Sequence, residues 1–256
     1  MKIKFFNSLL GITLLLACYS LKGQNSSEKS SAAVLLNVSF GGQIPGGDLA
    51  DRFGNNLFVG GGVGFKTRSN WILSWEAQFV FGSTVRNESA ILANSLTENL
   101  QVLNTNGSFA TIDLFQRGTY STFNAEKILG FWNATPNSGP VIGVGAGYNV
   151  SWMYLDNPGD AAPQFAGEKE KGYDQLSMGI MLKESIGYFH LSPNRRINFK
   201  VSFEFGQAFT ENVRDINFYE GPIRDPQQFD LFYGLRLDWF FPIYQLRKQE
   251  SEYYYN

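Results

Sequence analysis

The sequence has very few of the residues on which disulfides, thiolate metal sites and most nucleophilic enzymes depend. Its 256 residues include one cysteine and one histidine. One cysteine cannot form a disulfide within the chain, and a thiolate metal site needs several cysteines. The sequence therefore predicts no disulfide, no metal site and no cofactor.

Charge and long apolar runs are also scarce. Charged residues make up 17% of the chain, acidic residues slightly outnumber basic ones, and no basic cluster stands out. A nucleic-acid-binding surface needs such a cluster, so nucleic acid is not an expected partner. The sequence contains no run of about eighteen apolar residues, so a membrane-spanning helix is not predicted.

The N-terminus has the features of an export signal. Lys2 and Lys4 precede an apolar run at 5–17, which is too short to cross a bilayer as a helix. We expect a signal peptide at 1–23, a polar tether at 24–31 and a short periplasmic tail at 245–256. Alternatively, the run up to Cys18 resembles a lipoprotein box in which this cysteine is lipidated.

The rest of the chain contains long segments in which large apolar and polar residues alternate. In 229–241, for example, every odd position from Phe229 to Phe241 is apolar and large. Period two indicates a β-strand, because successive side chains point to opposite faces. All of these segments exceed the five or six residues typical of strands in soluble sheets. They lie at 33–42, 57–66, 71–81, 111–125, 141–154, 175–190, 197–210 and 229–241.

These segments predict an all-β fold over residues 32–244, an eight-stranded antiparallel up-and-down transmembrane β-barrel. Membrane barrels turn an apolar face to lipid and a polar face to the lumen. The connections alternate between long and short, as in outer-membrane barrels with short periplasmic turns and long outer loops. The pattern predicts a bacterial outer-membrane protein in contact with lipid, with both termini in the periplasm. Aromatic residues near both ends of the strands, such as Trp71 and Trp152, agree with two interfacial girdles.

Two positions disturb the alternation. In 111–125, Leu114 fits one phase and Phe123 the other, so we expect a β-bulge between them. Glu184 falls on the apolar face of 175–190, where a charge would meet lipid. A second bulge there would turn Glu184 away from the lipid.

Four short motifs resemble a known family. They are PGGDLADRFG at 45–54, QRG at 116–118, FEFGQAFT at 203–210 and DLFYG at 230–234. Together they resemble a family of small outer-membrane β-barrel proteins of Bacteroidota, over everything after the signal. The resemblance implies the fold and the location. Some small barrels of these bacteria serve secretion or envelope-assembly complexes, which implies a protein partner in the envelope.

The polar faces of the strands predict an ion-pair network in the lumen. Eight strands enclose only enough space for side chains, so charges there must pair with one another. If Phe209 faces Phe229 in the last two strands, facing position numbers add up to 438 and Lys200 faces Asp238. The candidates are Glu76, Arg117, Lys183, Lys200, Glu204, Asp230, Arg236 and Asp238, with Asp113 on the same predicted face.

Glycines recur on one face of two of these strands. They are Gly60, Gly62 and Gly64 in one strand and Gly143, Gly145 and Gly147 in another. On the lumen face, they would leave room for large side chains such as Phe232. A small ligand cavity is the alternative.

Two outer loops are expected to contain helices. Asp48 can cap a short helix that has Leu49 and Phe53 on one face. Residues 89–103 predict a longer amphipathic helix. Such a helix would either pack on the barrel mouth or dock a partner protein. The docking candidates are Leu92, Leu96 and Leu100.

These features predict a non-enzymatic outer-membrane protein with a filled lumen, which binds a partner through its outer loops or rims as part of an envelope complex. One alternative is an outer-leaflet lipid-modifying enzyme, but His190 falls at the periplasmic rim, away from the outer serines. A second is a soluble lipocalin-like carrier with its apolar faces turned inward, and a third is a small-ligand-binding barrel. Asp156, Asp160, Glu168 and Glu170 in one outer loop are a weak calcium alternative.

Overall fold

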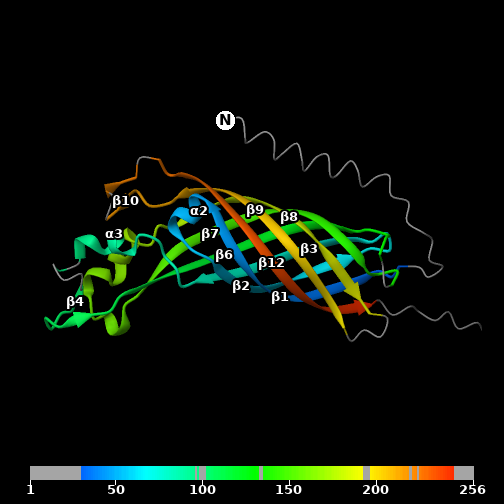
Figure 1. Cartoon of the computed structure of the whole chain (residues 1–256), viewed down its shortest axis with the longest axis horizontal. Helices are drawn as coiled ribbons and strands as arrows, with labels where there is room; N and C mark the ends of the chain where they lie inside the picture. The colour runs from blue at the N-terminus through cyan, green and yellow to red at the C-terminus, as the bar shows by residue number, and fades with distance from the viewer. Residues whose placement is uncertain are drawn as a thin grey trace, which may run out of the picture.

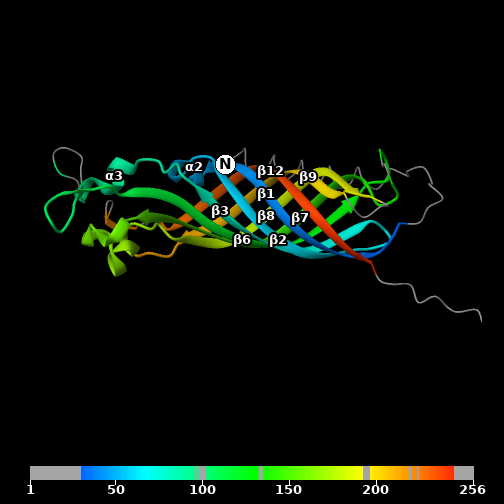
Figure 2. The ribbon, with the colours of Figure 1, turned by 90° about the horizontal axis from the view of Figure 1, so that it is seen from below.

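The computed structural model describes residues 30–244 except 96, 98–101, 133–134, 193–196, 219–220 and 224. The expected signal with Cys18 and the expected tail at 245–256 lie outside the described residues. Eight long strands close into a barrel (Figures 1 and 2). These strands are β1 (Ala33–Gly47), β2 (Asn56–Lys66), β3 (Trp71–Gly82), β6 (Asp113–Ile128), β7 (Gly139–Asp156), β8 (Ser177–Leu191), β9 (Asn198–Asn212) and β12 (Gln227–Tyr244).

Each long strand pairs antiparallel with its neighbour in the chain, and β1 pairs with β12 to close the ring. The predicted eight-stranded up-and-down barrel is confirmed. The strands are longer than the segments in which apolar and polar residues alternate. Strand β7, for example, has 18 residues and extends beyond the predicted segment 141–154 at both ends. Strands β9 and β12 have the predicted register, with Phe209 facing Phe229 and Lys200 facing Asp238.

The two ends of the barrel differ in their connections. Segments at 67–70, 129–138 and 192–197, of four, ten and six residues, join strands at one end, here called the turn end. Ala33 faces Tyr244, so β1 starts and β12 finishes at the turn end as well. The other end, here called the loop end, has connections at 48–55, 83–112, 157–176 and 213–226, and extends to the left in Figure 1.

No helix in the described part of the chain is long and apolar enough to cross a membrane. The loop end contains several short helices and strands. The elements are α2 (Asp48–Arg52), α3 (Glu88–Leu92), η2 (Ala93–Ser95), β4 (Val102–Leu103), β5 (Phe109–Ala110), η3 (Pro158–Asp160), η4 (Pro163–Phe165), η5 (Gly167–Gly172), β10 (Ile216–Asn217) and β11 (Gly221–Pro222).

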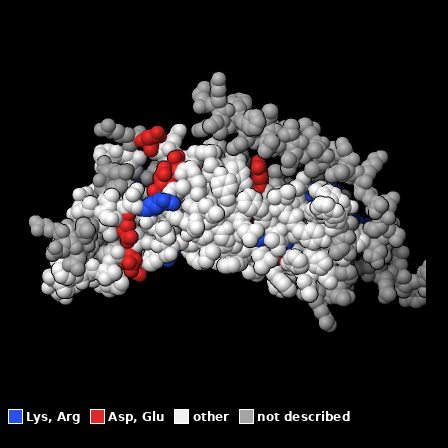
Figure 3. Space-filling model, in the orientation of Figure 1, with Lys and Arg blue, Asp and Glu red and all other residues white. Residues whose placement is uncertain are grey.

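The apolar faces of the strands point out of the barrel. In β9, Phe203 and Phe209 are about half exposed, whereas Lys200 and Glu204 are buried. The same alternation recurs in the other long strands, so large apolar side chains cover the outside. On the face seen in Figure 3, most of the surface is uncharged, and the largest group of charged side chains lies toward the loop end. The lipocalin-like alternative required apolar faces inside and is wrong.

Neither expected bulge is present. Strand β6 pairs without interruption with β3 and β7, and β8 pairs without interruption with β7 and β9. Leu114 points inward because it belongs to an apolar core at the loop end, whereas Phe123 points outward and is 71% exposed. Both therefore fit one continuous strand. Glu184 lies on the outer face, exposed, opposite Val144 and Phe205.

Four layers of side chains fill the lumen. Along β12 from the turn end, Phe240 belongs to an apolar layer, Arg236 and Asp238 to a charged layer, and Phe232 to a second apolar layer. The fourth layer is the apolar core of the loop end. Side chains thus occupy the lumen from end to end, as expected for eight strands.

Glycines allow close contact inside the barrel. A Cβ atom on Gly147 would lie 1.9 Å from the carbonyl oxygen of Ser121 in β6, and one on Gly206 would lie 1.9 Å from the ring of Phe232. Only glycine fits where backbone or a large ring approaches so closely. Gly206 therefore makes the room that Phe232 needs.

A buried lysine ties the turn end together. The ammonium of Lys66 donates to Ser30 Oγ at 2.7 Å, to Asn70 Oδ1 at 2.7 Å and to Asn137 Oδ1 at 3.0 Å. Lys66 is fully buried. It therefore joins the segment before β1 to two of the short turns.

Candidate functional site: the lumen network and the loop-end cap

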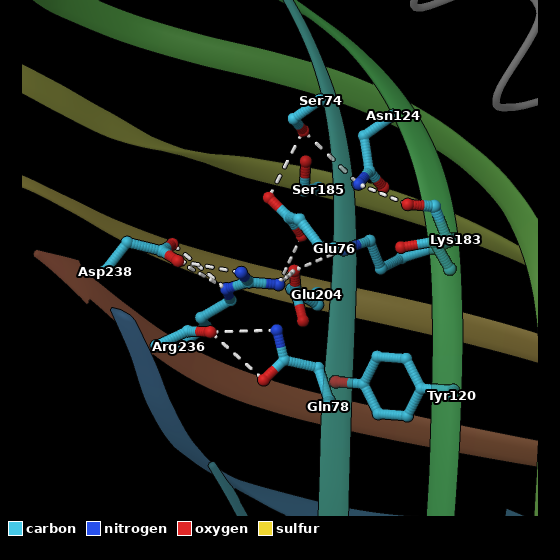
Figure 4. Close-up of polar contacts among 12 residues, drawn as sticks. Ser74, Glu76, Gln78, Tyr120, Asn124, Lys183, Ser185, Glu204, Arg236 and Asp238 are labelled. Atoms are coloured by element: carbon cyan, nitrogen blue, oxygen red, sulfur yellow. Dashed lines mark hydrogen bonds and ion pairs between the residues drawn. The ribbon is translucent and has the colours of Figure 1, made fainter. Parts of the chain in front are cut away.

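Arg236 lies at the centre of the charged layer (Figure 4). Its guanidinium contacts Asp238 through Nη2 at 2.7 Å and through Nε at 2.9 and 3.0 Å. Its Nη1 atom lies 2.8 Å from Glu76 Oε2 and 3.3 Å from Glu204 Oε1. Three strands thus contribute carboxylates to one guanidinium, whose planar fork suits several oxygens at once.

Two lysines extend the network. Lys183 Nζ lies 3.3 Å from Glu76 Oε2 and 3.0 Å from Glu204 Oε1. Lys200 Nζ lies 2.9 Å from Glu126 Oε1 and 3.5 Å from Asp238 Oδ2. Glu126 was not among the sequence candidates, although its even position in β6 places it on the lumen face with Tyr120 and Asn124.

The network contains three cations, Arg236, Lys183 and Lys200, and four carboxylates, all buried. Burying charges is costly unless their partners are well placed, and loss of one partner leaves a charge unpaired. A one-residue slip between β9 and β12 would turn these charges to the outer face. The network therefore fixes the register of the strands that it joins.

Asp230 lies apart from this network, nearer the loop end. Both of its carboxylate oxygens accept hydrogen bonds from Arg52 Nη2 of α2, at 2.8 and 2.9 Å, and Thr210 Oγ1 donates to Oδ2 at 2.9 Å. Arg52 Nη1 also donates to Ser177 Oγ at 3.0 Å. Asp230 thus anchors helix α2 over the mouth of the lumen.

The prediction that Arg117 lies in the lumen is wrong, as is the placement of Asp113. In β6 the even positions point inward, so both residues point outward. The Arg117 guanidinium lies over the rings of Phe115, at 5.1 Å, and Tyr154, at 5.6 Å. The expected bulge would have changed the phase of this strand, and without it Arg117 belongs to the outer face near the loop end.

The loops at the loop end pack around one apolar core, here called the cap. The core joins α2, α3, the segment before β6, the end of β7 and the β7–β8 loop. Its buried members are Leu49, Phe53, Ile91, Leu92, Val102, Ile112, Leu114, Met153, Leu155, Ala162, Phe165 and Tyr173. Because three of the four loop-end connections and the ends of β6 and β7 share this core, the cap closes the barrel as one packed unit.

Helix α2 forms where a short helix is predicted, with Leu49 and Phe53 buried, but Asp48 does not cap it. Gly47 occupies the N-cap with φ of 60°, a conformation that glycine adopts readily. The Asp48 carboxylate instead accepts a hydrogen bond from the backbone N–H of Phe229 at 2.6 Å. This bond ties α2 to the start of β12.

The long helix predicted at 89–103 is wrong. Helix α3 ends at Leu92, a short 3₁₀ turn follows, and Val102 begins strand β4. Leu92 is buried in the cap core and is not available for docking. Leu96 and Leu100 lie outside the described residues. At Ile91 and Leu92, the apolar spacing in this loop therefore reflects packing inside the cap core.

Polar and aromatic contacts connect the remaining loops. Arg214 Nε donates to Asp174 Oδ1 at 3.0 Å, and this hydrogen-bonded pair raises the pKa of the Arg214 guanidinium above its ordinary value. Burial, followed by the nearby Asp174 carboxylate, raises the pKa of Glu170 above its ordinary value. Tyr173 packs between Phe165 and Phe218, at centroid distances of 5.0 and 5.4 Å. These contacts join the β9–β12 loop to the β7–β8 loop.

Two small hairpins present apolar side chains at the far side of the cap. Hairpin β4–β5 exposes Leu103 (43%) and Phe109 (60%), and β10–β11 exposes Ile216 (52%), followed by Phe218 (47%). Both hairpins lie at the loop end in Figure 1. Each hairpin strand has only two residues, too few to show a period, so alternation does not reveal these exposed side chains.

The lone histidine lies at the turn end. His190 Nδ1 is 3.5 Å from Ser138 Oγ, a longer distance than a nucleophile–base pair normally has. The Ser138 hydroxyl is buried and accepts a hydrogen bond from the Leu191 backbone N–H at 3.0 Å, so it has a structural role. In the described ranges, no group of three histidine, cysteine, aspartate or glutamate side chains could hold a metal ion.

No protein-family model and no curated protein matches the chain. Several solved structures are similar to it, including the following three. Ail, the attachment invasion locus protein of Yersinia pestis, in complex with the heparin analogue sucrose octasulfate, shares 9% identity over 82% of this chain and 99% of its own, with a TM-score of 0.41. Neisserial surface protein A has 9% identity over 82% and 99%, with a TM-score of 0.40. The N-terminal β-barrel domain of Pseudomonas aeruginosa OprF has 9% identity over 84% and 100%, with a TM-score of 0.39. The fold of this chain rests on its own strand pairing.

Proposed function

We propose that the chain is an integral outer-membrane protein of a bacterium, with the turn end in the periplasm and the loop end outside. The observation that carries this proposal is the outer face of the barrel. Side chains such as Leu235 (62% exposed), Ile180 (64%) and Phe123 (71%) would have no favourable surroundings in water. In lipid, the same face meets apolar chains while every strand edge is paired.

Membrane insertion is tested on the full chain in isolated membranes. We expect the protein to stay in the membrane pellet after carbonate extraction, and the folded form to migrate differently on a gel before and after boiling. A control barrel of known insertion is treated alongside. Release of the protein by carbonate alone would contradict the proposal.

Within the membrane, the proposed role is to hold a closed scaffold that binds a partner, not to conduct solutes. The filled lumen supports this role, because apolar layers lie on both sides of the charged layer. Lumen residues such as Arg236 and Phe58 are fully buried. The resemblance to small barrels of Bacteroidota suggests that the partner belongs to a secretion or assembly complex of the envelope.

The cap is the proposed binding surface for a protein partner. Phe109 is exposed on a hairpin whose Val102 belongs to the cap core, and Ile216 is exposed near Phe218, which packs on Tyr173. Binding would therefore need little ordering of the loops. We expect Phe109→Ser together with Ile216→Ser to weaken recovery of a co-purifying envelope protein by about tenfold or more, and to leave the heat-dependent gel shift unchanged. A matched control is Phe40→Ser on the outer face of β1. Equal recovery with the cap variant and the wild type would refute binding at this surface.

The proposed role is non-enzymatic. This part of the proposal rests on the placement of His190, which lies at the opposite end from the cap and contacts a buried hydroxyl. Replacing His190 with Gln should leave partner recovery unchanged. Lipid analysis of membranes with and without the protein provides the direct test, and a change in lipid acylation that His190→Gln abolishes would establish the enzymatic alternative.

A further inference from the structure

Glu184 is an exposed carboxylate in the middle of an apolar surface. It occupies the central position of β8, and its side chain points out of the barrel. Its neighbours on the same face of the strand are Leu182 (49% exposed) and Ile186 (54%), and Val144 lies opposite. Uninterrupted pairing on both sides of β8 fixes this orientation.

The central position of Glu184 in β8 gives its depth, with Phe205 directly opposite. Tyr188 lies four positions toward the turn end on the same strand, and Phe209 lies opposite Ile180, four positions toward the loop end. Four residues of a tilted strand correspond to roughly 10 Å along the membrane normal. Glu184 therefore lies near the middle of the apolar band, where an ionisable side chain normally serves a function and has a partner.

The described part of the chain offers Glu184 no cation at its depth. Among the outward-facing side chains of the described strands, the cations are Arg117 and Lys127. Arg117 lies near the loop end over Tyr154, and Lys127 donates to the backbone of Ser69 in a short turn. Neither side chain reaches the depth of Glu184. A second copy of the chain would present the same set, so it also lacks a cation at this depth.

An apolar groove adjoins Glu184 on the outer surface. Its volume is about 830 Å³, and its lining includes Val144, Ala146 and Leu182 next to the carboxylate, and Trp75 and Phe123 farther along. The small side chain of Ala146, on the outward face of β7, reduces the bulk of this part of the wall. The outer surface thus combines an apolar groove, which could hold apolar side chains of a partner, with the carboxylate of Glu184 at the edge of the groove.

We propose that this surface docks a membrane-embedded segment of another protein, which carries a basic side chain at mid-membrane depth. The apolar part of the segment would fill the groove, and its basic side chain would pair with Glu184. Charge complementarity selects this occupant, because the charged headgroups of lipids lie at the membrane surfaces. The site lies on the side of the barrel, away from the cap. It requires membrane insertion but not partner binding by the cap.

Photocrosslinking in intact outer membranes tests the proposal. A photoreactive residue replaces Leu182 in the groove or, as a control, Val38 at the centre of β1, outside the groove. We expect a discrete crosslinked protein from position 182 and none from position 38. The yield should fall by about tenfold in Glu184→Gln, because a desolvated charge pair is lost. Mass spectrometry should locate a lysine or arginine in the crosslinked segment, and replacing that residue with Glu should restore crosslinking to Glu184→Lys.

Several results would overturn the proposal. These are a product with twice the mass of the chain, adducts to lipid only, a crosslinked segment without a basic residue, and an unchanged yield in Glu184→Gln. The gel shift on boiling shows whether each variant is folded and inserted, so a failure of the proposed membrane location is seen before any crosslinking result. If Glu184→Lys does not fold, the comparison of Glu184→Gln with the wild type decides alone.

Discussion

Arg236 provides the sharpest test of the charged layer. Replacing it with Leu removes one of three cations and leaves four carboxylates with two lysines. Glu76 and Glu204 keep Lys183, but Asp238 keeps only Lys200 at 3.5 Å and a hydrogen bond from Asn37 at 2.8 Å. Breaking a buried pair in this way costs about 3–5 kcal/mol. We expect Arg236→Leu to lower the free energy of unfolding by that amount.

A second substitution shows whether the cost comes from the unpaired charge. Asp238→Asn removes the charge that Arg236 contacts most closely and retains an acceptor for Asn37. In the double variant, we expect the loss to be smaller than the sum of the two single losses by about 2 kcal/mol, which is typical of residues in direct contact. Loss of the negative charge offsets loss of the positive one.

The assay is reversible unfolding by denaturant in detergent micelles or lipid vesicles, followed by tryptophan fluorescence. Asp230→Asn is the matched control, because Asp230 lies on the same strand, about 20 Å from Arg236, and pairs with Arg52 instead. Its effect should add to that of Arg236→Leu within about 0.5 kcal/mol. Plain additivity of Arg236→Leu and Asp238→Asn would refute the reasoning.

Three further predictions concern other parts of the barrel. Gly147→Ala should abolish folding or lower stability severely, because its Cβ would lie 1.9 Å from a carbonyl oxygen, whereas Gly42→Ala, with 3.4 Å to its nearest neighbour, should fold normally by the gel-shift assay. Arg52→Leu should lower the unfolding midpoint and expose the cap to proteases, and a cap as resistant as the wild type would show that the Asp230 pair does not hold α2. Planar-bilayer recordings of the pure protein should show no stable open channel, and reproducible conductance steps would contradict the filled lumen.

The strands could be predicted because the alternation of apolar and polar residues within each segment determines which side chains face outward. Alternation over more than ten residues fixes which side chains point outward, and Phe203 and Glu204 show this directly. The pairing of Lys200 with Asp238 followed from one assumption about the ends of two strands. The wrong placement of Arg117 has a related cause. Leu114 is apolar, so the alternation placed it and the other even positions at the start of β6 on the outer face, but Leu114 points inward because the lumen is apolar inside the cap.

The cap could not be predicted in the same way. Its core combines residues from three strand connections and the ends of two strands, and no single segment shows a regular period. Leu92 illustrates the difficulty, because a leucine at helical spacing gives no indication of whether its face meets solvent or another loop. Glu126 was missed because a weakly patterned strand concealed its phase. Loop packing depends on contacts between distant segments, which alternation does not encode.

The seam between β1 and β12 has a consequence for how the barrel assembles. It joins the first and last long strands through 15 facing pairs, and Ala33 lies opposite Tyr244. Contacts between such distant segments form late, because loop closure is costly until the intervening chain is ordered. Until then, two long strand edges stay open to other chains. Lys66 donates to Ser30 and to Asn137 in the β6–β7 turn, so its contacts hold the turn end together but do not cross this seam, whose closure depends on the 15 strand pairs.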